Sequence, residues 1–194
     1  MIDVLVDTRP FKPLLKESRD NPGAIVVEGL MQVAGDLNGN GRIYPREILD
    51  REVKKLKETF IKNGNAFGEL DHPDSPIVSL QNVSHVIKDL WWEGDNLMGR
   101  VEILNTPFGN IVKEILKAGY NIGISSRGQG TVREISGGKV VVNDDFDLIT
   151  WDFVSNPSVS NAFMKPVGTL SESNNCSGKY TKLNDILNNI LRNG

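Results

Sequence analysis

Short segments of alternating apolar and polar residues, separated by tight turns, limit the fold of this chain more than any other feature. Alternation with a period of two predicts strands at residues 77–92 and 96–104. The same pattern continues over residues 121–154, with turn sequences at 136–138 and 143–145. Tight turns reverse the chain, so successive strands pair in antiparallel order. The sequence therefore predicts an α+β protein built mainly on an antiparallel sheet or barrel.

Helical spacing interrupts this pattern in two places. A helix is expected over residues 45–62, because proline suits its first position and apolar residues recur every three or four positions. A second is expected over residues 107–118, with Thr106 as its N-cap and Gly119 at its end. Residues 24–34 are rich in β-forming side chains and should form the first core strand. A few helices around one sheet or barrel fit this order better than a doubly wound sheet does.

The chain of 194 residues suits one domain with an appendage at each end. Residues 1–22 contain three prolines and a solvated polar run, which indicates a leader and candidate propeptide. The domain itself is expected over residues 23–168. Residues 169–194 form a polar linker and an amphipathic helix, whose apolar residues have helical spacing: Leu183, Ile186, Leu187, Ile190 and Leu191. This tail could dock on the domain, bind a partner or be removed.

Charge and cysteine content exclude several classes of function. With 22 Lys and Arg against 25 Asp and Glu, the chain has no basic excess that would favour nucleic acid. Cys176 is the only cysteine, so an intramolecular disulfide and a cysteine metal cluster are both excluded, which fits a reducing compartment. The N-terminus carries Asp3 and Asp7 without a long apolar run, so no signal peptide is expected. No stretch approaches the roughly 20 apolar residues that span a bilayer.

The two histidines are the candidate bases for a serine nucleophile, which needs a base to take its proton and donors to hold the oxyanion. His72 lies in Gly-Glu-Leu-Asp-His-Pro at 68–73, where the proline restricts the backbone; a surface histidine in an acidic turn is the alternative. His85 lies among apolar residues of a predicted strand, which is more typical of a core histidine, and it is the reserve candidate. A serine hydrolase is therefore the first hypothesis, and a protease is its sharper form.

Ser125 and Ser126 are the candidate nucleophiles, in the segment Gly-Ile-Ser-Ser-Arg-Gly-Gln-Gly at 123–130. Because neighbours in a strand point to opposite faces, only one of them can face a given base, and Ser126 is the reserve. Backbone amides near Arg127 and Gly128 could hold an oxyanion, and the Arg127 charge could also do so unless it forms a surface ion pair. The spacing misses the hydrolase elbow Gly-x-Ser-x-Gly by one residue, so the segment alone is a weak signal.

An acid inside an apolar strand is the candidate third residue. Asp152 lies in Thr-Trp-Asp-Phe-Val at 150–154, and a buried carboxylate needs a partner, such as a histidine that it orients. A surface acid at a strand end is the alternative. Glu69 and Asp147 are rivals for the orienting role.

Residues 36–47 match a competing motif, the calcium loop, with ligand-type side chains at the required spacing: Asp36, Asn38, Asn40 and Glu47. A helix should precede such a loop, whereas a strand is predicted here, and Pro45 lies inside the loop. Calcium binding is therefore a minor alternative, and no metal site is expected.

These segments, in chain order, resemble the prohead (procapsid) maturation proteases of tailed bacteriophages, in the myovirus core-protease branch. The matching motifs are Glu28-Gly29, Asn38-x-Asn40-x-Arg42-x-Tyr44-Pro45, Gly68-Glu69-Leu70-x-His72-Pro73, Asp89-Leu90-Trp91-Trp92, Gly123-Ile124-Ser125-Ser126-Arg127-Gly128, Asp152 and Asn156-Pro157-Ser158. Each motif is weak alone, but their combination over about residues 24–166 is specific. The resemblance also accounts for the Asn-rich loop without calcium.

The resemblance implies a serine endopeptidase with the closed, mostly antiparallel β-barrel of the herpesvirus assemblins, wrapped by helices. His72 maps onto the general base and Ser125 onto the nucleophile, and Asp152 is assigned as the acid that orients the histidine. No cofactor is needed. The implied substrates are phage scaffold, core and capsid proteins, cut inside the assembling prohead in the host bacterial cytoplasm. No membrane or direct nucleic-acid partner is expected, and a homo-oligomer is left open.

The resemblance further implies cleavage after glutamate in Leu/Ile-x-Glu sites. Two such sites end at Glu17 and Glu172, at the edges of the expected domain, so self-cleavage is expected there. Leu56-Lys57-Glu58 also matches but should be protected inside a helix. A non-enzymatic scaffold protein for capsid assembly, with the tail helix as its contact, is the main alternative.

Overall fold

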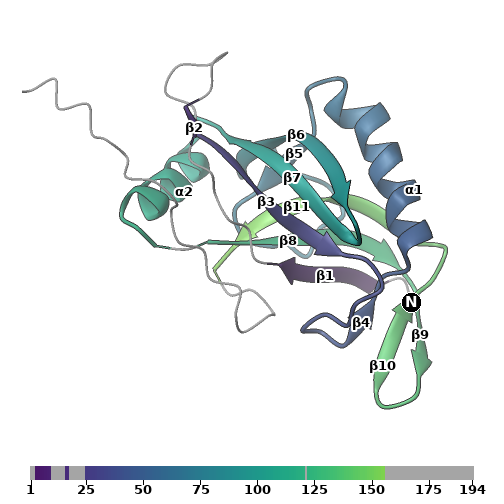
Figure 1. The fold of residues 1–194 in the computed structure, drawn as a ribbon. Helices are drawn as coiled ribbons and strands as arrows, with labels where there is room; N and C mark the ends of the chain where they lie inside the picture. Colours follow the sequence, from purple (N-terminus) through teal and green to yellow (C-terminus); the bar gives the residue numbers. More distant parts are fainter. Residues whose placement is uncertain (1–2, 10–15, 18–24, 121, 156–194) are drawn as a thin grey trace, which may run out of the picture.

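The computed structural model describes residues 3–9, 16–17, 25–120 and 122–155, which form three sheets and two α-helices (Figure 1). In chain order the elements are β1 (Asp3–Arg9), β2 (Lys16–Glu17), β3 (Ile25–Val33), β4 (Arg42–Ile43), α1 (Arg46–Leu56), the π-helical turn η1 (Lys57–Ile61), β5 (Phe67–Glu69), β6 (Val83–Glu93), β7 (Asn96–Ile103), α2 (Pro107–Lys117), β8 (Gly123–Gly130), β9 (Val132–Ile135), β10 (Lys139–Val142) and β11 (Asp147–Val154). Strand pairs are antiparallel except for β4 and β10. The predicted α+β class with mainly antiparallel pairing is confirmed.

The sheets with the orders β2-β3-β7-β6-β5 and β1-β8-β11 contain the longest strands, and these two large sheets meet where β5 ends. There Leu70 forms a single bridge with Phe153 of β11. The bridge is not extended because the chain turns away at Asp71, whose φ is 64°. Among the described residues the strands therefore form separate sheets, and the closed barrel predicted from the sequence is not found.

Both helices inside the strand pattern are confirmed, with ends close to those predicted. The first begins directly after Pro45 as α1 and continues through η1. At the start of α2, Oγ1 of Thr106 accepts a hydrogen bond from the N–H of Gly109 at 3.0 Å. Gly119, with φ 81°, follows the end of that helix in the left-handed conformation typical of a helix stop.

The predicted strands lie close to their expected ranges, except where a loop replaces the start of one of them; the sequence did not predict β1, β2 or β4. Residues 77–82 form this loop, and β6 begins only at Val83, because side chains satisfy part of the loop backbone in place of a sheet ladder. The N–H of Ser79, for example, donates to Oε1 of Glu69 at 2.8 Å. In the predicted leader, β1 pairs along β8 and β2 pairs with β3, so its described residues add edge strands to both large sheets.

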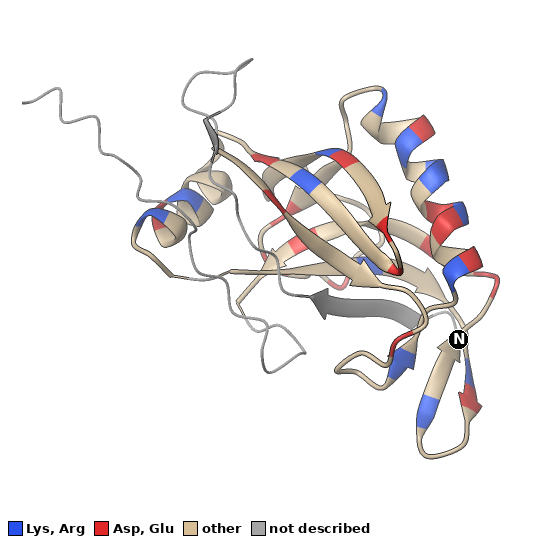
Figure 2. Cartoon of the chain, viewed as in Figure 1, with Lys and Arg blue, Asp and Glu red and all other residues tan. Residues whose placement is uncertain are grey.

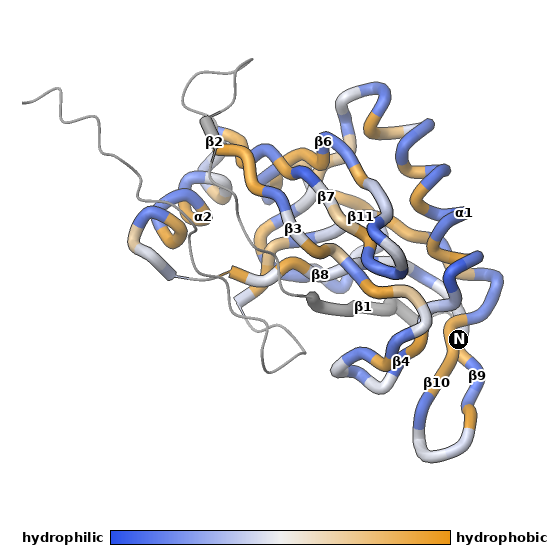
Figure 3. The backbone as a smooth tube through the Cα atoms, in the orientation of Figure 1, coloured by the Kyte–Doolittle hydropathy of each residue, from blue (hydrophilic) through white to orange (hydrophobic). Residues whose placement is uncertain are grey.

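One continuous hydrophobic core joins both large sheets to the helices. Met31 of β3, Leu49 of α1, Ile124 of β8 and Phe153 of β11 are all completely buried in it. Apolar positions recur along the strands in Figure 3, whereas Figure 2 shows Lys, Arg, Asp and Glu along the length of α1. No helix in the described part of the chain is both long and apolar enough to cross a membrane.

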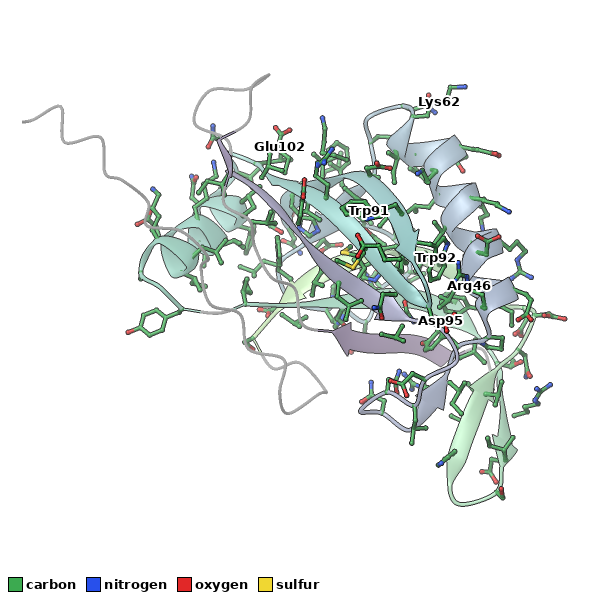
Figure 4. The ribbon with its side chains drawn as sticks, in the orientation of Figure 1. Arg46, Lys62, Trp91, Trp92, Asp95 and Glu102 are labelled. Carbon is green, nitrogen blue, oxygen red and sulfur yellow. The ribbon has the colours of Figure 1, made fainter. Side chains whose placement is uncertain are left out.

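Arg46 fixes the start of α1 against the hairpin between β6 and β7 (Figure 4). Its guanidinium carbon lies 3.5 Å from the centre of the Trp92 ring. Nη1 also donates to the carbonyl of Gly94 at 2.6 Å and lies 3.3 Å from Oδ1 of Asp95. A cation–π contact of this kind stabilises the fold by about 1 kcal/mol. The Trp91-Trp92 motif therefore contributes to packing through its second residue.

Candidate active site

A sharp turn after β5 brings His72 beside β11. The N–H of Asp71, in its left-handed conformation, donates to the carbonyl of Phe153 at 2.7 Å. This turn places Nδ1 of His72 2.9 Å from Oδ2 of Asp152, with the imidazole 16% exposed. Nε2 has no hydrogen-bond partner within the part of the chain that the structure describes. A carboxylate thus holds one nitrogen, and the other can serve a second group.

Asp152 is completely buried in β11, which excludes the alternative of a surface acid. Its Oδ1 accepts the N–H of Glu69 at 2.9 Å and Nη2 of Arg127 at 3.2 Å. Its Oδ2 lies 2.9 Å from Nε of Arg127 as well as 2.9 Å from Nδ1 of His72. Because a carboxylate accepts, it favours the imidazole tautomer with the proton on Nδ1, which leaves Nε2 as an acceptor.

Ser125 and Ser126 are both buried in β8, on opposite faces of the sheet. Ser125 is the cross-strand partner of Asp152, and directly paired residues share a face. Ser126 pairs instead with the completely buried Trp151. Ser125 therefore lies on the face where the Asp152 carboxylate holds His72, and Ser126 lies on the opposite face.

Arg127 is completely buried, which excludes the surface ion pair considered for it. Its Nη2 lies 2.9 Å from Oε1 of Glu69, and its Nη1 donates to the carbonyl of Ser75 at 2.8 Å. With its contacts to Asp152, the guanidinium is engaged by two carboxylates and one carbonyl. These contacts direct the charge of Arg127 into the protein, which makes the side chain unsuited to hold an oxyanion.

At Gly128, the next residue of β8, packing leaves no room for a side chain. A Cβ there would lie 2.5 Å from the ring of Phe146 and 2.8 Å from the carbonyl of Asp147. Close approach of β8 and the start of β11 therefore requires glycine. This requirement is steric and is separate from any role of the Gly128 amide.

His85 has the buried environment predicted for a core histidine. Oγ of Ser84 lies 2.8 Å from its Nδ1, and its Nε2 lies 3.0 Å from the carbonyl oxygen of Trp151. The carbonyl only accepts, so Nε2 carries the proton and Nδ1 accepts from the serine. Burial lowers the pKa of His85 to about 4, against the opposing effect of the Asp152 charge. With both nitrogens occupied, His85 is unsuited as the base.

The two rivals of Asp152 lie in very different surroundings. Asp147 is exposed at the start of β11 and forms an ion pair with Lys55 of α1. Glu69 is completely buried and pairs with Arg127, while its own N–H donates to Asp152. Sequence reasoning missed this ion pair. The sequence carried no signal for it, because the two residues are 58 positions apart and the β8 segment, Gly-Ile-Ser-Ser-Arg-Gly-Gln-Gly, is not apolar.

Residues 36–47, which match the calcium-loop motif that was the minor alternative, have a different construction. They follow strand β3, not a helix, and Oδ1 of Asn38 accepts the N–H groups of Asn40 at 3.0 Å and Arg42 at 2.9 Å. These bonds close the loop around the asparagine side chain, as in an Asx turn. Throughout the described residues, no group of three or more His, Cys, Asp or Glu side chains could hold a metal ion.

A histidine held by a buried carboxylate, beside a strand that carries a serine, is the arrangement of a serine hydrolase. Comparison with known proteins specifies the family. The family described as "Prohead core protein serine protease" matches residues 6–175, and the chain belongs to it. The protein is therefore a serine protease, a hydrolase of phage prohead assembly.

A curated relative and a solved structure from bacteriophage T4 support this assignment. The chain is 32% identical over 148 residues to the prohead core protein protease of Enterobacteria phage T4, covering 75% of this chain and 69% of the relative. The solved structure of the bacteriophage T4 capsid assembly protease is similar, with a TM-score of 0.75 and 28% identity, covering 80% of this chain and 99% of that one. The similarity thus extends over most of the described fold.

Proposed function

We propose that this protein is the endopeptidase that cuts scaffold, core and capsid proteins, and itself, inside the assembling phage prohead in the host cytoplasm. His72, Ser125 and Asp152 are its proposed catalytic residues. The observation that carries this assignment is the shared face of Ser125 and Asp152, with Nδ1 of His72 2.9 Å from the Asp152 carboxylate. The family and the names of its T4 relatives support the prohead as the place of action.

In the proposed mechanism, Oγ of Ser125 attacks the scissile carbonyl carbon while Nε2 of His72 takes the hydroxyl proton. Asp152 keeps the imidazole in the required tautomer and stabilises the imidazolium. His72 then gives the proton to the leaving amine, and the C–N bond breaks. Water, activated by the same histidine, attacks the acyl ester and releases the acid product, which returns Ser125 to its hydroxyl form. The proton that His72 takes from this water passes to Oγ of Ser125 as the ester C–O bond breaks.

The oxyanion donors are proposed to be backbone amides near Arg127 and Gly128. Both residues lie in β8, which pairs with β1 on one side and with β11 on the other. Departure of β1 would open one hydrogen-bonding edge of β8 beside Ser125, because Thr8 is the β1 residue that pairs with Ser125. Removal of the leader would therefore change the surroundings of the nucleophile directly.

The proposed specificity is cleavage after glutamate in Leu/Ile-x-Glu sites, with self-cleavage after Glu17 and Glu172. Glu17 is the last residue of β2, so a cut there would separate β1 and β2 from the rest of the domain. Glu172 lies outside the described residues. The third matching site is protected, since it runs from buried Leu56 at the end of α1 into η1. Cuts after Glu17 and Glu172 would leave residues 18–172, which contain the proposed domain of residues 23–168.

A fluorophosphonate probe tests the proposal, because it modifies only a serine that a nearby base activates. Mass spectrometry of the labelled wild-type protein should find the probe on Ser125. The His72→Ala protein should remain unlabelled, and Ser126→Ala should label as wild type does. Absence of labelling in folded wild-type protein, or a label on Ser126, would contradict the proposed site. Intact mass after long incubation then tests the cuts at Glu17 and Glu172, with Ser125→Ala as the inactive control.

A further inference from the structure

The ion pair between Glu69 and Arg127 has contacts beyond what packing alone requires. Both side chains are completely buried, and Nη2 of Arg127 lies 2.9 Å from Oε1 of Glu69. Arg127 also contacts both oxygens of Asp152, which holds His72. We infer that Glu69 and Arg127 are positioning residues that hold Asp152 and the loop after His72 and set the net charge around the imidazole. This inference rests on the proposed catalytic roles of His72, Ser125 and Asp152.

The ion pair holds the connection between β5 and β6, residues 70–82, at two points. Oε1 of Glu69 accepts the N–H of Ser79 at 2.8 Å, and Nη1 of Arg127 donates to the carbonyl of Ser75 at 2.8 Å. The loop begins beside His72, so the same two side chains contact the acid that holds the imidazole and the backbone that follows it. A displacement of either side chain would therefore change the position of His72 relative to Ser125.

Glu69 is not fully satisfied by these contacts. Its Oε2 has no hydrogen-bond partner among the residues that the structure describes, although the side chain is completely buried. A buried ion pair that only stabilises a fold can often be replaced by apolar side chains without loss, and an unsatisfied carboxylate oxygen makes this pair still less favourable for stability. An electrostatic role in the site accounts for its presence.

The charges around His72 can be counted element by element. Asp152 on β11 and Glu69 on β5 supply two negative charges, and Arg127 on β8 supplies one positive charge. His85 on β6 is neutral because its pKa is lowered to about 4. In the loop itself the charged groups are exposed and well solvated: Asp71 and Asp74. The buried groups therefore have a net charge of minus one when His72 is neutral.

This excess negative charge favours the protonated form of His72 that follows serine attack. Proton transfer from Ser125 to His72 then changes the net charge of these side chains and the imidazole from minus one to zero. Without the Glu69 charge, the same transfer would change it from zero to plus one. Removal of the Glu69 charge alone should make the imidazolium less stable, because nearby opposite charges in a buried site favour the charged form. Removal of both members of the pair restores the original count, since Asp152 alone again provides minus one.

The test compares pH profiles of peptide cleavage for Glu69→Gln and for the double variant Glu69→Leu/Arg127→Met. We expect Glu69→Gln to lower kcat by about tenfold or more, because the developing imidazolium is destabilised. The acid limb of its kcat/KM profile should move to lower pH by about one unit. The double variant should cleave slowly, because the loop has lost its two contacts, but its acid limb should return to the wild-type position.

Glu52→Gln is the matched control. Glu52 is another buried carboxylate, and it accepts the N–H of Leu148 at 3.0 Å and Nζ of Lys55 at 3.0 Å. Its replacement should lower stability without moving the pH profile or kcat. An unmoved acid limb in folded Glu69→Gln, or an equal change in Glu52→Gln, would overturn the inference.

The double variant keeps the test decisive if Glu69→Gln fails to fold, because an apolar replacement of a buried ion pair is generally well tolerated. An acid limb about one unit away from that of wild type in the double variant would also overturn the charge count. A Ser125→Ala reference separates the two proposals. Cleavage that survives Ser125→Ala would reject the proposed function and this inference together. Loss of cleavage in Ser125→Ala with an unchanged profile in folded Glu69→Gln would reject this inference alone.

Discussion

One histidine of this chain lies in β6 and the other follows β5, the strand that pairs with β6. The two rings differ in the groups that their nitrogens contact. His85, in β6, has Ser84 Oγ on one side and the Trp151 carbonyl on the other. His72, just beyond β5, has the Asp152 carboxylate on Nδ1 and no partner for Nε2 among the described residues. Consecutive residues of β11 therefore hold the two rings, one through a backbone carbonyl and the other through a carboxylate.

The difference fits a structural role for His85 and the proposed catalytic role for His72. Complete burial lowers the pKa of His85 to about 4, although the Asp152 charge and the Trp151 carbonyl act to raise it, so its ring remains an uncharged link between β6 and β11. A carboxylate partner on one nitrogen and partial exposure of the ring make His72 the better candidate for the base. Substitutions at the two sites should therefore affect different quantities: catalysis at His72 and stability at His85.

The largest expected effect separates the two sites by activity. His72→Gln should lower kcat/KM by about 10⁴-fold or more, because the base is lost, and it should leave the protein folded. His85→Gln should lower the unfolding midpoint but keep kcat/KM within about tenfold of wild type below that midpoint. Peptide cleavage and thermal unfolding of the same samples measure both. Equal loss of cleavage in two folded variants would break the comparison.

The next effect concerns the close packing around His85. A Cβ on Gly68 would lie 2.3 Å from Nε2 of His85 and 2.3 Å from the carbonyl oxygen of Trp151. Gly68→Ala should therefore lower the free energy of unfolding by about 3 kcal/mol, by forcing β5 and β11 apart. Gly64→Ala is the control, because φ is 71° there but nothing lies within 4 Å, and it should cost only about 1 kcal/mol. Denaturant unfolding compares them, and equal costs would contradict the packing account.

A smaller effect follows from the pKa of His85. Its lowering from 6.5 to about 4 means that the unfolded chain binds a proton below about pH 6.5 that the folded protein does not bind. Stability is therefore full above that pH and is lost as the pH falls toward 4, with a loss of about 2 kcal/mol between pH 7 and pH 5. Denaturant unfolding at the two pH values measures this loss. A His85→Gln protein should lack it, and an unchanged pH dependence there would assign the loss to other groups.

The smallest effect concerns the hydroxyl beside His85. Ser84→Ala leaves the buried Nδ1 of His85 without its donor, which should lower the free energy of unfolding by about 1 kcal/mol. Cleavage should remain as in wild type, because the ring is not the base. Unfolding and kcat/KM of this variant would sharpen the comparison. A loss of activity without a loss of stability would show that His85 takes part in the reaction.

The sequence predicted most of the local structure, because alternation and capping act over a few residues. The N-cap at Thr106, the stop at Gly119 and the strands on either side of the β6–β7 turn all follow from such signals. The extent of strand pairing between the sheets could not be predicted from such local signals, because closure of a barrel depends on long-range pairing. At Leu70 that pairing stops after one bridge, since Asp71 turns the chain away.

The candidate site was predictable by residue type but not by its electrostatics. The sequence singled out His72, Ser125 and Asp152, and the fold brings the loop of His72 beside the paired strands of the other two. It gave no sign that Arg127 is buried, because a lone arginine in a strand looks the same whether it faces water or a carboxylate. Its partner Glu69 is 58 positions away in the chain, and only the tertiary structure brings the two together.

The most direct test of the account is cleavage of a Leu-x-Glu peptide by the wild-type, Ser125→Ala and Ser126→Ala proteins, each checked for folding by circular dichroism. The two serines are adjacent and both buried, so the substitutions are closely matched in size and surroundings. The account predicts that Ser126→Ala cleaves at a rate close to wild type, while Ser125→Ala loses about 10⁴-fold or more. Wild-type cleavage by Ser125→Ala, or an inactive but folded Ser126→Ala, would contradict it.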